Sequence, residues 1–470
     1  MPNNPTVLHA EGVVFETTVP VLIIGAGAAG VTAALAARDA GAKVLVLERD
    51  DRPTGSTSMS SGFVPAAGTA AQTRQGIEDS TEIFAEDIQA KAAGLAEPSL
   101  VAMATQQIAP ALDWLEEEHG LEWQVLDGFL YPGHRRHRMH AVPERTGAAL
   151  LQQLLSAAAT HGIPIATGAR VTTLFTGSDG LIAGARVVRS DGCTEQIGCR
   201  ALILACCGFG ANRDLVRQHI PIMSDAPYWG HSGNVGDALI WGNALGADTS
   251  CLSGAQGHGS LAHPHGALIT WALMMEGGIQ VNAEGRRFSN EHRGYSEQSV
   301  DVLAQTDGLA WCIFDQRLYQ TACGFPDFRD AEATGAVLTA SDASSLAKST
   351  GIDPVGLAQT LEDVRAFTSG VKVDPHGRDF TYQPPLGSPL CAVKVTGALF
   401  HTQGGLMIGP DARVQTKNVD INVFAAGGSA CGVSGPHISG YLSGNGLLTA
   451  IAFGRLAGQH AAKIAAKAQG

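Results

Sequence analysis

The sequence has few of the features that mark several large classes of protein. Aromatic residues make up 6% of the 470-residue chain, no basic run occurs, and the formal net charge is −13, which argues against nucleic acid as a partner. No stretch has the length and apolarity of a transmembrane helix, and the residues before Val21 lack the apolar core of a secretion signal. The nine cysteines form no C-x-x-C pair, which argues against c-type haem, sulfur clusters and a disulfide framework. These absences favour a reducing cytoplasm, and the length allows two domains.

The most informative motif that is present lies at residues 21–30, V-L-I-I-G-A-G-A-A-G. Its apolar half predicts a buried parallel strand, and residues 31–40 then continue as an alanine-rich helix. Gly25 permits the tight turn, Gly27 lets the backbone approach a pyrophosphate, and Gly30 lets helix and strand pack closely. The start of the helix offers N–H groups and a positive dipole end to the phosphates.

A second buried strand is predicted at residues 43–47 and is followed by Glu48. An acid at about this distance from the glycines binds a ribose hydroxyl. The next loop, residues 51–62, is rich in glycine and in small hydroxyl side chains that can press onto a cofactor, although a solvated linker would have a similar composition. Strand, glycines, helix, strand and acid in register predict a dinucleotide site.

The remaining chain divides into segments of two different amino-acid compositions. Helices are predicted at residues 99–119 and 146–160, and alternating segments at residues 165–188 indicate an antiparallel meander. From about residue 258 histidine, glycine and proline become frequent. Near residue 404 the composition again resembles that of the first segment, and a closing helix is predicted at 446–465. The sequence therefore predicts one domain interrupted by an insert.

Taken in chain order, several short segments resemble the FAD flavoproteins of the fumarate reductase and 3-ketosteroid dehydrogenase superfamily. These segments are residues 25–30, 55–57, 61–62, 233–237, 281–291, 314–316, 401–405, 425–427 and 443–445. The resemblance implies an α/β fold with a Rossmann-like, GR2-type FAD-binding domain that is discontinuous, at residues 1–258 and 390–470. An inserted α+β capping domain at residues 259–389 would hold the substrate against the flavin. Non-covalent FAD is implied, because the loop at 56–62 lacks the histidine that covalent members use.

The resemblance also implies which residues contact FAD. They are Gly25, Gly27, Ala28, Ala29, Gly30, Glu48, Arg49, Gly55, Ser56, Thr57, Ser61, Gly62, Val171, Ala205, Gly208, Asp237, Gly427, Ser443, Gly444, Asn445 and Leu447. The sequence departs from the usual pattern at two places. Cys206 and Cys207 stand where the group usually has Thr-Gly, and Gly428 stands where a charged residue often meets the ribityl chain.

Two tyrosines decide which branch the sequence resembles. Fumarate reductases clamp a dicarboxylate with arginines, and in the same register this chain has Tyr441 and Tyr319. A phenol is neutral and can donate to a ketone oxygen or pass on a proton, whereas arginine is a permanent cation suited to carboxylates. The Δ4 type of ketosteroid dehydrogenase resembles this chain at both positions. His401, however, matches the substrate-binding histidine of fumarate reductases, and Arg317 lies two residues from Tyr319.

The expected reaction is desaturation of a cyclic ketone, either a 3-ketosteroid or a cyclohexanone-type ring. Tyr441 would stabilise the enolate oxygen, and Tyr319 would accept the α-proton, with Ser443 as a candidate relay for that proton. FAD would take the hydride at N5. His401, Arg317 and Arg293 are further candidates for substrate binding. The alternative for both tyrosines is that they only pack.

Other functions and partners stay open at this point. The second enzyme hypothesis is an enoate reductase resembling fumarate reductase that uses Arg287, Arg293, Arg317 and His401 on an unsaturated acid. An electron-transfer subunit without a substrate would need haem or cluster motifs, which the sequence lacks. The electron acceptor (quinone, carrier protein or oxygen) and the choice between monomer and homo-oligomer are not indicated. No metal site is predicted, because the histidines at 134–140 have no cysteine or carboxylate partner in the same loop.

Overall fold

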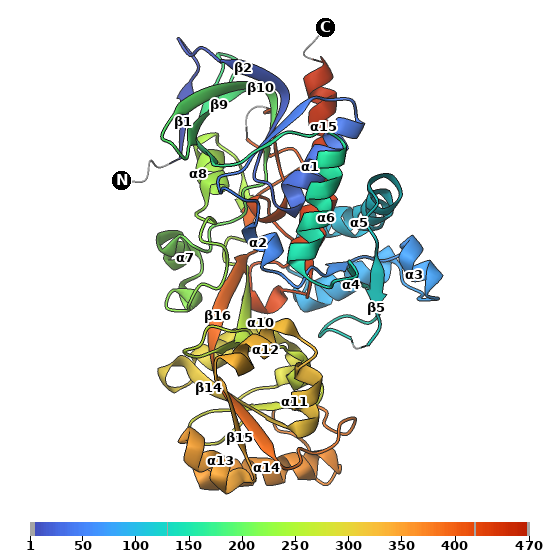
Figure 1. The fold of residues 1–470 in the computed structure, drawn as a ribbon, viewed down its shortest axis with the longest axis vertical. Coiled ribbons are helices and arrows are strands. Elements are labelled where there is room, and N and C mark those ends of the chain that lie inside the picture. Colours follow the sequence, from blue (N-terminus) through green and yellow to red (C-terminus); the bar gives the residue numbers. More distant parts are fainter. Residues whose placement is uncertain (1–4, 129, 418–419, 468–470) are drawn as a thin grey trace. The chain divides into compact units, whose positions relative to one another are not determined.

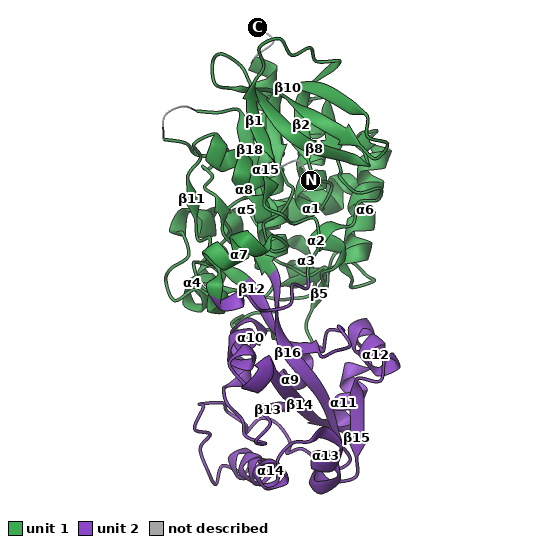
Figure 2. Ribbon diagram, turned by 90° about the vertical axis from the view of Figure 1, so that its left-hand side faces the viewer, with its two compact units in different colours: residues 1–221, 230–255, 401–470 green, residues 222–229, 256–400 purple. Residues whose placement is uncertain are grey.

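The computed structural model describes residues 5–128, 130–417 and 420–467. The chain forms two units. Unit 1 consists of Met1–Pro221, Gly230–Ala255 and His401–Gly470, and unit 2 consists of Ile222–Trp229 and Gln256–Phe400 (Figure 2). The predicted insert, residues 259–389, lies inside unit 2. Unit 2 also includes the segment 222–229, because Leu399 N–H donates to the Pro227 carbonyl at 2.9 Å and Trp229 N–H donates to the Leu399 carbonyl at 2.8 Å.

Unit 1 is built on an eight-stranded sheet of order β1-β8-β9-β10-β2-β3-β7, with β18 paired to β10. The strands are β1 (Thr6–His9), β2 (Thr17–Ile24), β3 (Val44–Leu47), β7 (Ile165–Ala166), β8 (Ala169–Thr176), β9 (Ile182–Arg189), β10 (Thr194–Leu204) and β18 (Val423–Ala425). The central strand β2 runs parallel to β10 and β3, in the register Val21↔Ala201 and Val21↔Val44. Parallel strands of this kind are buried on both faces, and residues 21–24 are accordingly buried.

The other elements of unit 1 are helices and short strands around this sheet. The helices are α1 (Ala28–Asp39), α2 (Gly55–Ser58), α3 (Ala70–Arg74), α4 (Thr81–Lys91), α5 (Pro98–His119), α6 (Gly147–Thr160), α7 (Arg213–His219), α8 (Asp237–Ala244) and α15 (Asn445–Lys467). The short strands are β4 (Val64–Pro65), β5 (Gln124–Leu126), β6 (Met139–Ala141), β11 (Thr249–Ser250) and β17 (Gly405–Leu406). Helix α6 begins after Thr146, whose side chain accepts from Ala149 N–H at 3.2 Å.

Helices α1 and α15 bring together two parts of unit 1 that are far apart in the sequence. They lie side by side, blue and red in Figure 1. Small residues allow the close approach, because a Cβ at Gly458 would lie 2.2 Å from the Ala33 carbonyl oxygen and a Cβ at Gly454 would lie 2.6 Å from that of Ala29. The C-terminal helix therefore completes the motif that begins at residue 21, as a discontinuous domain requires.

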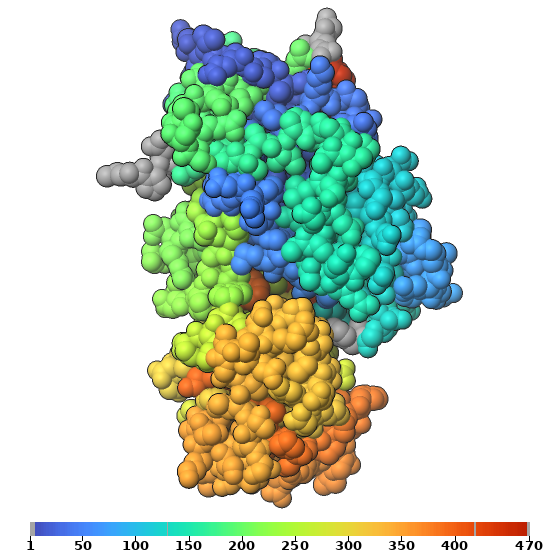
Figure 3. All heavy atoms as spheres, in the orientation of Figure 1, coloured from blue at the N-terminus to red at the C-terminus, as the bar shows by residue number. Residues whose placement is uncertain are grey.

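Unit 2 has its own five-stranded sheet and its own apolar core. The sheet order is β12-β16-β14-β13, with β15 paired to β16, and the strands are β12 (Ala255–Ala262), β13 (Ile279–Val281), β14 (Leu309–Asp315), β15 (Val337–Ala340) and β16 (Leu390–Thr402). The helices are α9 (Ala272–Met275), α10 (Tyr295–Leu303), α11 (Gln316–Ala322), α12 (Pro326–Ala333), α13 (Ala343–Thr350) and α14 (Pro354–Thr368). Helices α12 and α13 lie on the surface of this unit, in orange in Figure 3. Helices with a mainly antiparallel sheet make unit 2 an α+β unit, and the predicted α/β fold class of the chain is confirmed.

Candidate active site

The glycine turn after β2 has the geometry that a phosphate cradle needs. Gly25 has φ 104°, and a Cβ there would lie 2.4 Å from the Ala205 carbonyl oxygen. A Cβ at Gly30 would lie 1.9 Å from the Gly25 carbonyl oxygen, so only glycine fits this helix–strand contact. Helix α1 begins directly after Gly27, which places its first N–H groups at the mouth of the turn.

Glu48 is fixed beside this turn by two backbone donors. Ala26 N–H donates to its Oε2 at 2.9 Å, and Asp50 N–H donates to its Oε1 at 3.0 Å. Each carboxylate oxygen keeps a further lone pair that can accept from a ribose hydroxyl. The side chain is therefore held in the orientation that an adenosine ribose would use.

The loop at residues 55–62 lies against the same turn. Ala28 N–H donates to the buried Thr57 Oγ1 at 2.9 Å, which ties the start of α1 to α2. Asn234 Nδ2 donates to Ser56 Oγ at 2.8 Å, so the 233–237 segment joins the cluster. Gly62 has φ 73° and abuts the Thr146 backbone. The predicted cofactor segments thus meet in unit 1.

The start of α15 closes the cluster from the C-terminal side. Gly427 lies under α1, where its Cβ would be 3.1 Å from the Ala29 Cβ. The Ser443 carbonyl accepts from His134 Nε2 at 3.1 Å, and burial lowers the pKa of His134 to about 3, so this histidine is neutral. The remaining residues with a predicted cofactor role also lie in unit 1, namely Arg49, Gly55, Ser61, Val171, Gly208, Gly444 and Leu447.

Two buried polar atoms fit a dinucleotide at this place. Within the described part of the chain, Asp237 Oδ1 and Asn445 Oδ1 have no hydrogen-bond partner. Burial raises the pKa of Asp237, although Arg170 and Arg49 act against this shift. A buried polar atom without a hydrogen-bond partner costs folding free energy unless a ligand or water binds it. Hydroxyls of a bound cofactor would satisfy both, so the residues present fit FAD.

Tyr441 lies four residues before α15 and is 6% exposed. Burial raises the pKa of Tyr441 to about 12, although the backbone N–H groups of Gly446 and Gly444 at the helix start hydrogen-bond its oxygen and act in the opposite direction. The phenol is therefore protonated at neutral pH. It is suited to donating a hydrogen bond rather than to accepting a proton.

His401 does not stand alone, because a hydrogen-bonded chain runs through it. Its Nε2 lies 3.4 Å from Cys207 Sγ, and Gln403 Nε2 lies 2.8 Å from its Nδ1. Ser434 Oγ donates to Gln403 Oε1 at 2.9 Å, and Asn445 Nδ2 donates to Ser434 Oγ at 3.0 Å. Sequence reasoning found His401 and Asn445 but not Gln403 or Ser434, because a pattern of short motifs gives no weight to the polar residues that link them.

The other residues with a predicted substrate role lie in unit 2 and are engaged there. Tyr319 donates a hydrogen bond to the Glu332 carboxylate and packs edge-on against Phe328. Arg317 donates to the Glu276 carbonyl at 3.1 Å. Arg293 is paired with Asp301 at 3.3 Å. The structure therefore gives each of these side chains a partner within unit 2.

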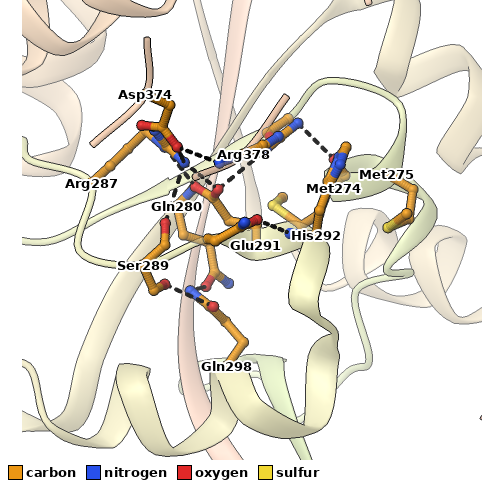
Figure 4. A network of polar contacts seen from close by, with 12 residues as sticks. Met274, Met275, Gln280, Arg287, Ser289, Glu291, His292, Gln298, Asp374 and Arg378 are labelled. Atoms are coloured by element: carbon orange, nitrogen blue, oxygen red, sulfur yellow. Dashed lines mark hydrogen bonds and ion pairs between the residues drawn. The ribbon is translucent and has the colours of Figure 1, made fainter. Parts of the chain in front are cut away.

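Arg287, which the fumarate-like hypothesis used as a substrate cation, is a buried structural charge. It pairs with Glu291 at 2.7 Å and with Asp374 at 2.6 Å, and Arg378 pairs with the same Glu291 at 3.1 Å (Figure 4). Although burial would raise it, these arginines hold the pKa of Glu291 at about 2. Two arginines and two carboxylates balance in charge. The assignment of Arg287 to substrate binding is wrong.

Unit 2 contains an aromatic cluster that sequence reasoning missed. His258 stacks on Tyr295, with ring centroids 4.7 Å apart, and on Phe400 at 5.2 Å, while Trp271 meets its edge at 5.8 Å. Burial lowers the pKa of His258 to about 3, so the ring is neutral. Tyr295 is half-buried and is the first residue of α10. The sequence feature that could have indicated this cluster is the pair Gly294-Tyr295 at the start of α10.

Neither a metal cluster nor a membrane-spanning helix is found among the described residues. Across residues 5–128, 130–417 and 420–467, no three His, Cys, Asp or Glu side chains come together as a metal site. In the predicted cationic loop, Arg138 is instead paired with Asp79 and Asp87, each at 2.8 Å. Among the helices of these same residues, none combines the length and apolarity that crossing a bilayer requires.

The fold and the cofactor residues define an FAD-dependent oxidoreductase. The chain matches the FAD binding domain family over residues 20–447 and belongs to that family. It is 32% identical over 457 residues to a probable fumarate reductase of Shewanella frigidimarina (strain NCIMB 400), covering 96% of this chain and 76% of that protein. It is 28% identical over 464 residues to a urocanate reductase of Eggerthella lenta, covering 96% and 75% of the two chains.

Solved structures agree with this assignment. The open conformation of a flavocytochrome c3 fumarate reductase matches with a TM-score of 0.81 at 31% identity, covering 97% of this chain and 80% of that one. A 3-ketosteroid-Δ4-(5α)-dehydrogenase of Rhodococcus jostii RHA1 matches with a TM-score of 0.77 at 24% identity, covering 98% and 99%, a likeness of fold alone. The predicted superfamily, the FAD cofactor and an oxidoreductase acting on CH–CH groups are confirmed. The resemblance to the Δ4 branch, a cytoplasmic location and a substrate stay predictions.

Proposed function

We propose that this enzyme acts on a neutral carbonyl compound and desaturates a cyclic ketone, either a 3-ketosteroid or a cyclohexanone-type ring, to its α,β-unsaturated form. The observation that carries the proposal is the Tyr441 hydroxyl at the start of α15. The segment 427–446 contains no Lys, Arg, Asp or Glu. A carboxylate substrate would require charge compensation there, whereas a ketone oxygen requires only donors.

FAD would be held in unit 1 by the glycine turn at 25–30, by Glu48, by the 55–62 loop and by the start of α15. When bound, it supplies an acceptor for the hydride leaving the β-carbon. The loop at 56–62 has no histidine, so we expect the cofactor to be non-covalent. Acid precipitation should release the yellow chromophore into the supernatant, and colour retained in the pellet would contradict this expectation.

Tyr441 has the role of donor to the substrate's carbonyl oxygen. Its pKa of about 12 keeps it protonated, and the N–H groups of Gly446 and Gly444 that bond its oxygen polarise its O–H further. Charge grows on the carbonyl oxygen as the α-proton leaves, so this hydrogen bond strengthens in the transition state. Ser443, which is buried and lies two residues from Tyr441 in the sequence, is the candidate relay for the α-proton.

The proton acceptor is a tyrosine of unit 2, and Tyr295 fits this role better than Tyr319. A carboxylate beside a phenol opposes ionisation, and Tyr319 donates to Glu332. Tyr295 instead stands at the N-terminal end of α10, where the helix dipole favours a negative oxygen, and it stacks on a neutral histidine. Tyr319 remains the acceptor that the sequence resemblance implies.

A second candidate function is reduction of an α,β-unsaturated acid, which the names of the similar proteins favour. His401 is its best support in this chain, because a cationic imidazole would pair with a carboxylate. Anaerobic mixing of the dithionite-reduced enzyme with cyclohex-2-enone or with fumarate separates the two. Reoxidation by the enone supports a neutral carbonyl, and reoxidation by fumarate alone supports the reductase.

A further inference from the structure

Cys207 occupies an unusual place in the loop that follows β10, three residues after the strand ends. It has φ 67°, in the left-handed region where a side chain is rarely found. Its Sγ lies 3.4 Å from His401 Nε2 and 3.5 Å from Ser56 Oγ. Ser56 belongs to the cofactor loop, so this thiol is part of the FAD site of unit 1.

His401 is oriented toward the sulfur by the polar chain behind it. The Gln403 side-chain amide lies 2.8 Å from Nδ1 and holds the ring so that its other nitrogen, Nε2, faces Cys207. The Gln403 orientation is in turn set by Ser434, which donates to its Oε1 at 2.9 Å. A base held by a third group against a thiol is the arrangement that activates cysteine nucleophiles.

The two adjacent thiols differ sharply in their surroundings. Burial acts to raise the pKa of Cys207, but the charge of His401 and the hydrogen bonds from His401 and Ser56 outweigh it, and the pKa lies below the ordinary thiol range. The pKa of His401 is raised by the thiolate opposite, against the effect of burial. Burial and the nearby Asp237 raise the pKa of Cys206 to about 12. Cys207 is thus the reactive member of the pair.

We propose that Cys207, paired with His401, is a nucleophilic thiol that adds reversibly to alkenes conjugated to a carbonyl. His401 Nε2 takes the thiol proton, the sulfur forms a bond to the β-carbon, the alkene π pair shifts to give an enolate, and the α-carbon then takes that same proton from Nε2. The sum is addition of S–H across C=C, with no oxidant or reductant, and elimination reverses it. The alkene class rests on the proposed function, whose product is such a compound. The adduct would inhibit the enzyme reversibly and covalently.

The test is alkylation of the purified FAD-loaded enzyme, followed by peptide mass spectrometry. N-ethylmaleimide is one probe and cyclohex-2-enone the other. We expect Cys207 to be labelled at neutral pH about ten-fold faster than Cys206 in the same molecule. We expect both reagents to label Cys207 faster than the exposed Cys193 as well. This comparison needs no variant, so folding cannot confuse it.

Two variants then test the pairing. His401→Gln keeps a donor but no titratable charge, and the alkylation rate of Cys207 at neutral pH should fall about ten-fold toward that of an ordinary thiol. Cys206→Ser is the matched control and should leave the Cys207 rate unchanged. FAD content, read from absorbance, shows whether each variant is folded.

Several results would overturn the inference. One is that Cys207 stays unlabelled while Cys193 reacts, and another is a Cys207 rate that is the same in His401→Gln. Labelling by the maleimide without any enone adduct would also refute capture of unsaturated carbonyls. If the adduct forms but no ketone is desaturated, the inference stands and the proposed function falls.

Discussion

At the scale of single residues, Tyr441 is the side chain on which the proposed chemistry depends most. Tyr441→Phe removes the donor to the developing oxyanion, so we expect turnover to fall ~100- to 1000-fold with normal FAD content. Tyr382→Phe is the matched control, because Tyr382 is 86% exposed and the change should leave turnover near wild type. Steady-state kinetics with the best ketone measure both. Full activity of Tyr441→Phe would exclude it as the donor.

A second residue-scale prediction decides between the two tyrosines of unit 2. Removing the proton acceptor typically costs ~100- to 10,000-fold, so Tyr295→Phe should lose this much turnover while ketone binding changes less. Tyr319→Phe should lose far less, because its hydroxyl is committed to Glu332. Rapid anaerobic flavin reduction separates turnover from binding. The reverse order of the two losses would return the role to Tyr319.

At the scale of elements, the sequence predicted the cofactor half of the molecule well. The glycine turn, helix α1 and strand β3 are local features, and each follows from a short run of residues with one stereochemical requirement. Helix α15 was predicted from residue 446 and begins at Asn445. The partner of Tyr319 could not be predicted, because Glu332 lies on another helix and only the packing of α11 and α12 brings the two together.

The glycine turn offers an element-scale test with an internal control. A Cβ at Gly25 would lie 2.4 Å from the Ala205 carbonyl oxygen, at a φ of 104°. Gly41 is also left-handed, at φ 86°, but among the described residues no atom lies within 4 Å of such a Cβ. Gly25→Ala should therefore lose FAD. Gly41→Ala should cost only about 1–2 kcal/mol of stability and retain FAD.

The measurement is the FAD-to-protein ratio after gel filtration, together with Tm. If both variants kept a full complement of FAD, the turn at Gly25 would not be the constraint that the structure indicates.

At the scale of the whole molecule, buried neutral histidines couple stability to pH. Burial lowers the pKa of His134 and His258 to about 3 and that of His140 and His292 to about 4. In the unfolded chain these rings titrate near their ordinary value of about 6.5. Between about pH 6.5 and about pH 4 the unfolded chain therefore binds more protons than the folded one. The free energy of unfolding should fall as pH falls, by up to about 1.4 kcal/mol per pH unit for each histidine.

His258→Phe tests this linkage, because phenylalanine keeps the stacking on Tyr295 and Phe400 but cannot titrate. The slope of unfolding free energy against pH, measured by urea denaturation, should decrease in this variant by up to about 1.4 kcal/mol per pH unit, which corresponds to one proton. His265→Gln, at an exposed position, should leave the slope unchanged. An unaltered slope in His258→Phe would mean that His258 does not contribute to acid sensitivity.

The whole molecule also shows where sequence reasoning stopped. The superfamily, FAD and the discontinuous arrangement followed from motifs spread over the chain. On sequence grounds Arg287 is a possible substrate cation, because a lone arginine in a motif gives no sign of its partners. Its buried pair with Asp374 joins positions 87 residues apart, and such a pair is visible only after folding.

The most direct test of the central claim is anaerobic flavin reduction by saturated compounds in stopped flow, with cyclohexanone, a 3-ketosteroid and succinate compared at equal concentration. We predict bleaching of the oxidised flavin band by a cyclic ketone, loss of most of that rate in Tyr441→Phe, and no bleaching by succinate. Bleaching by succinate alone, with no ketone effective, would contradict the account and assign the enzyme to the dicarboxylates.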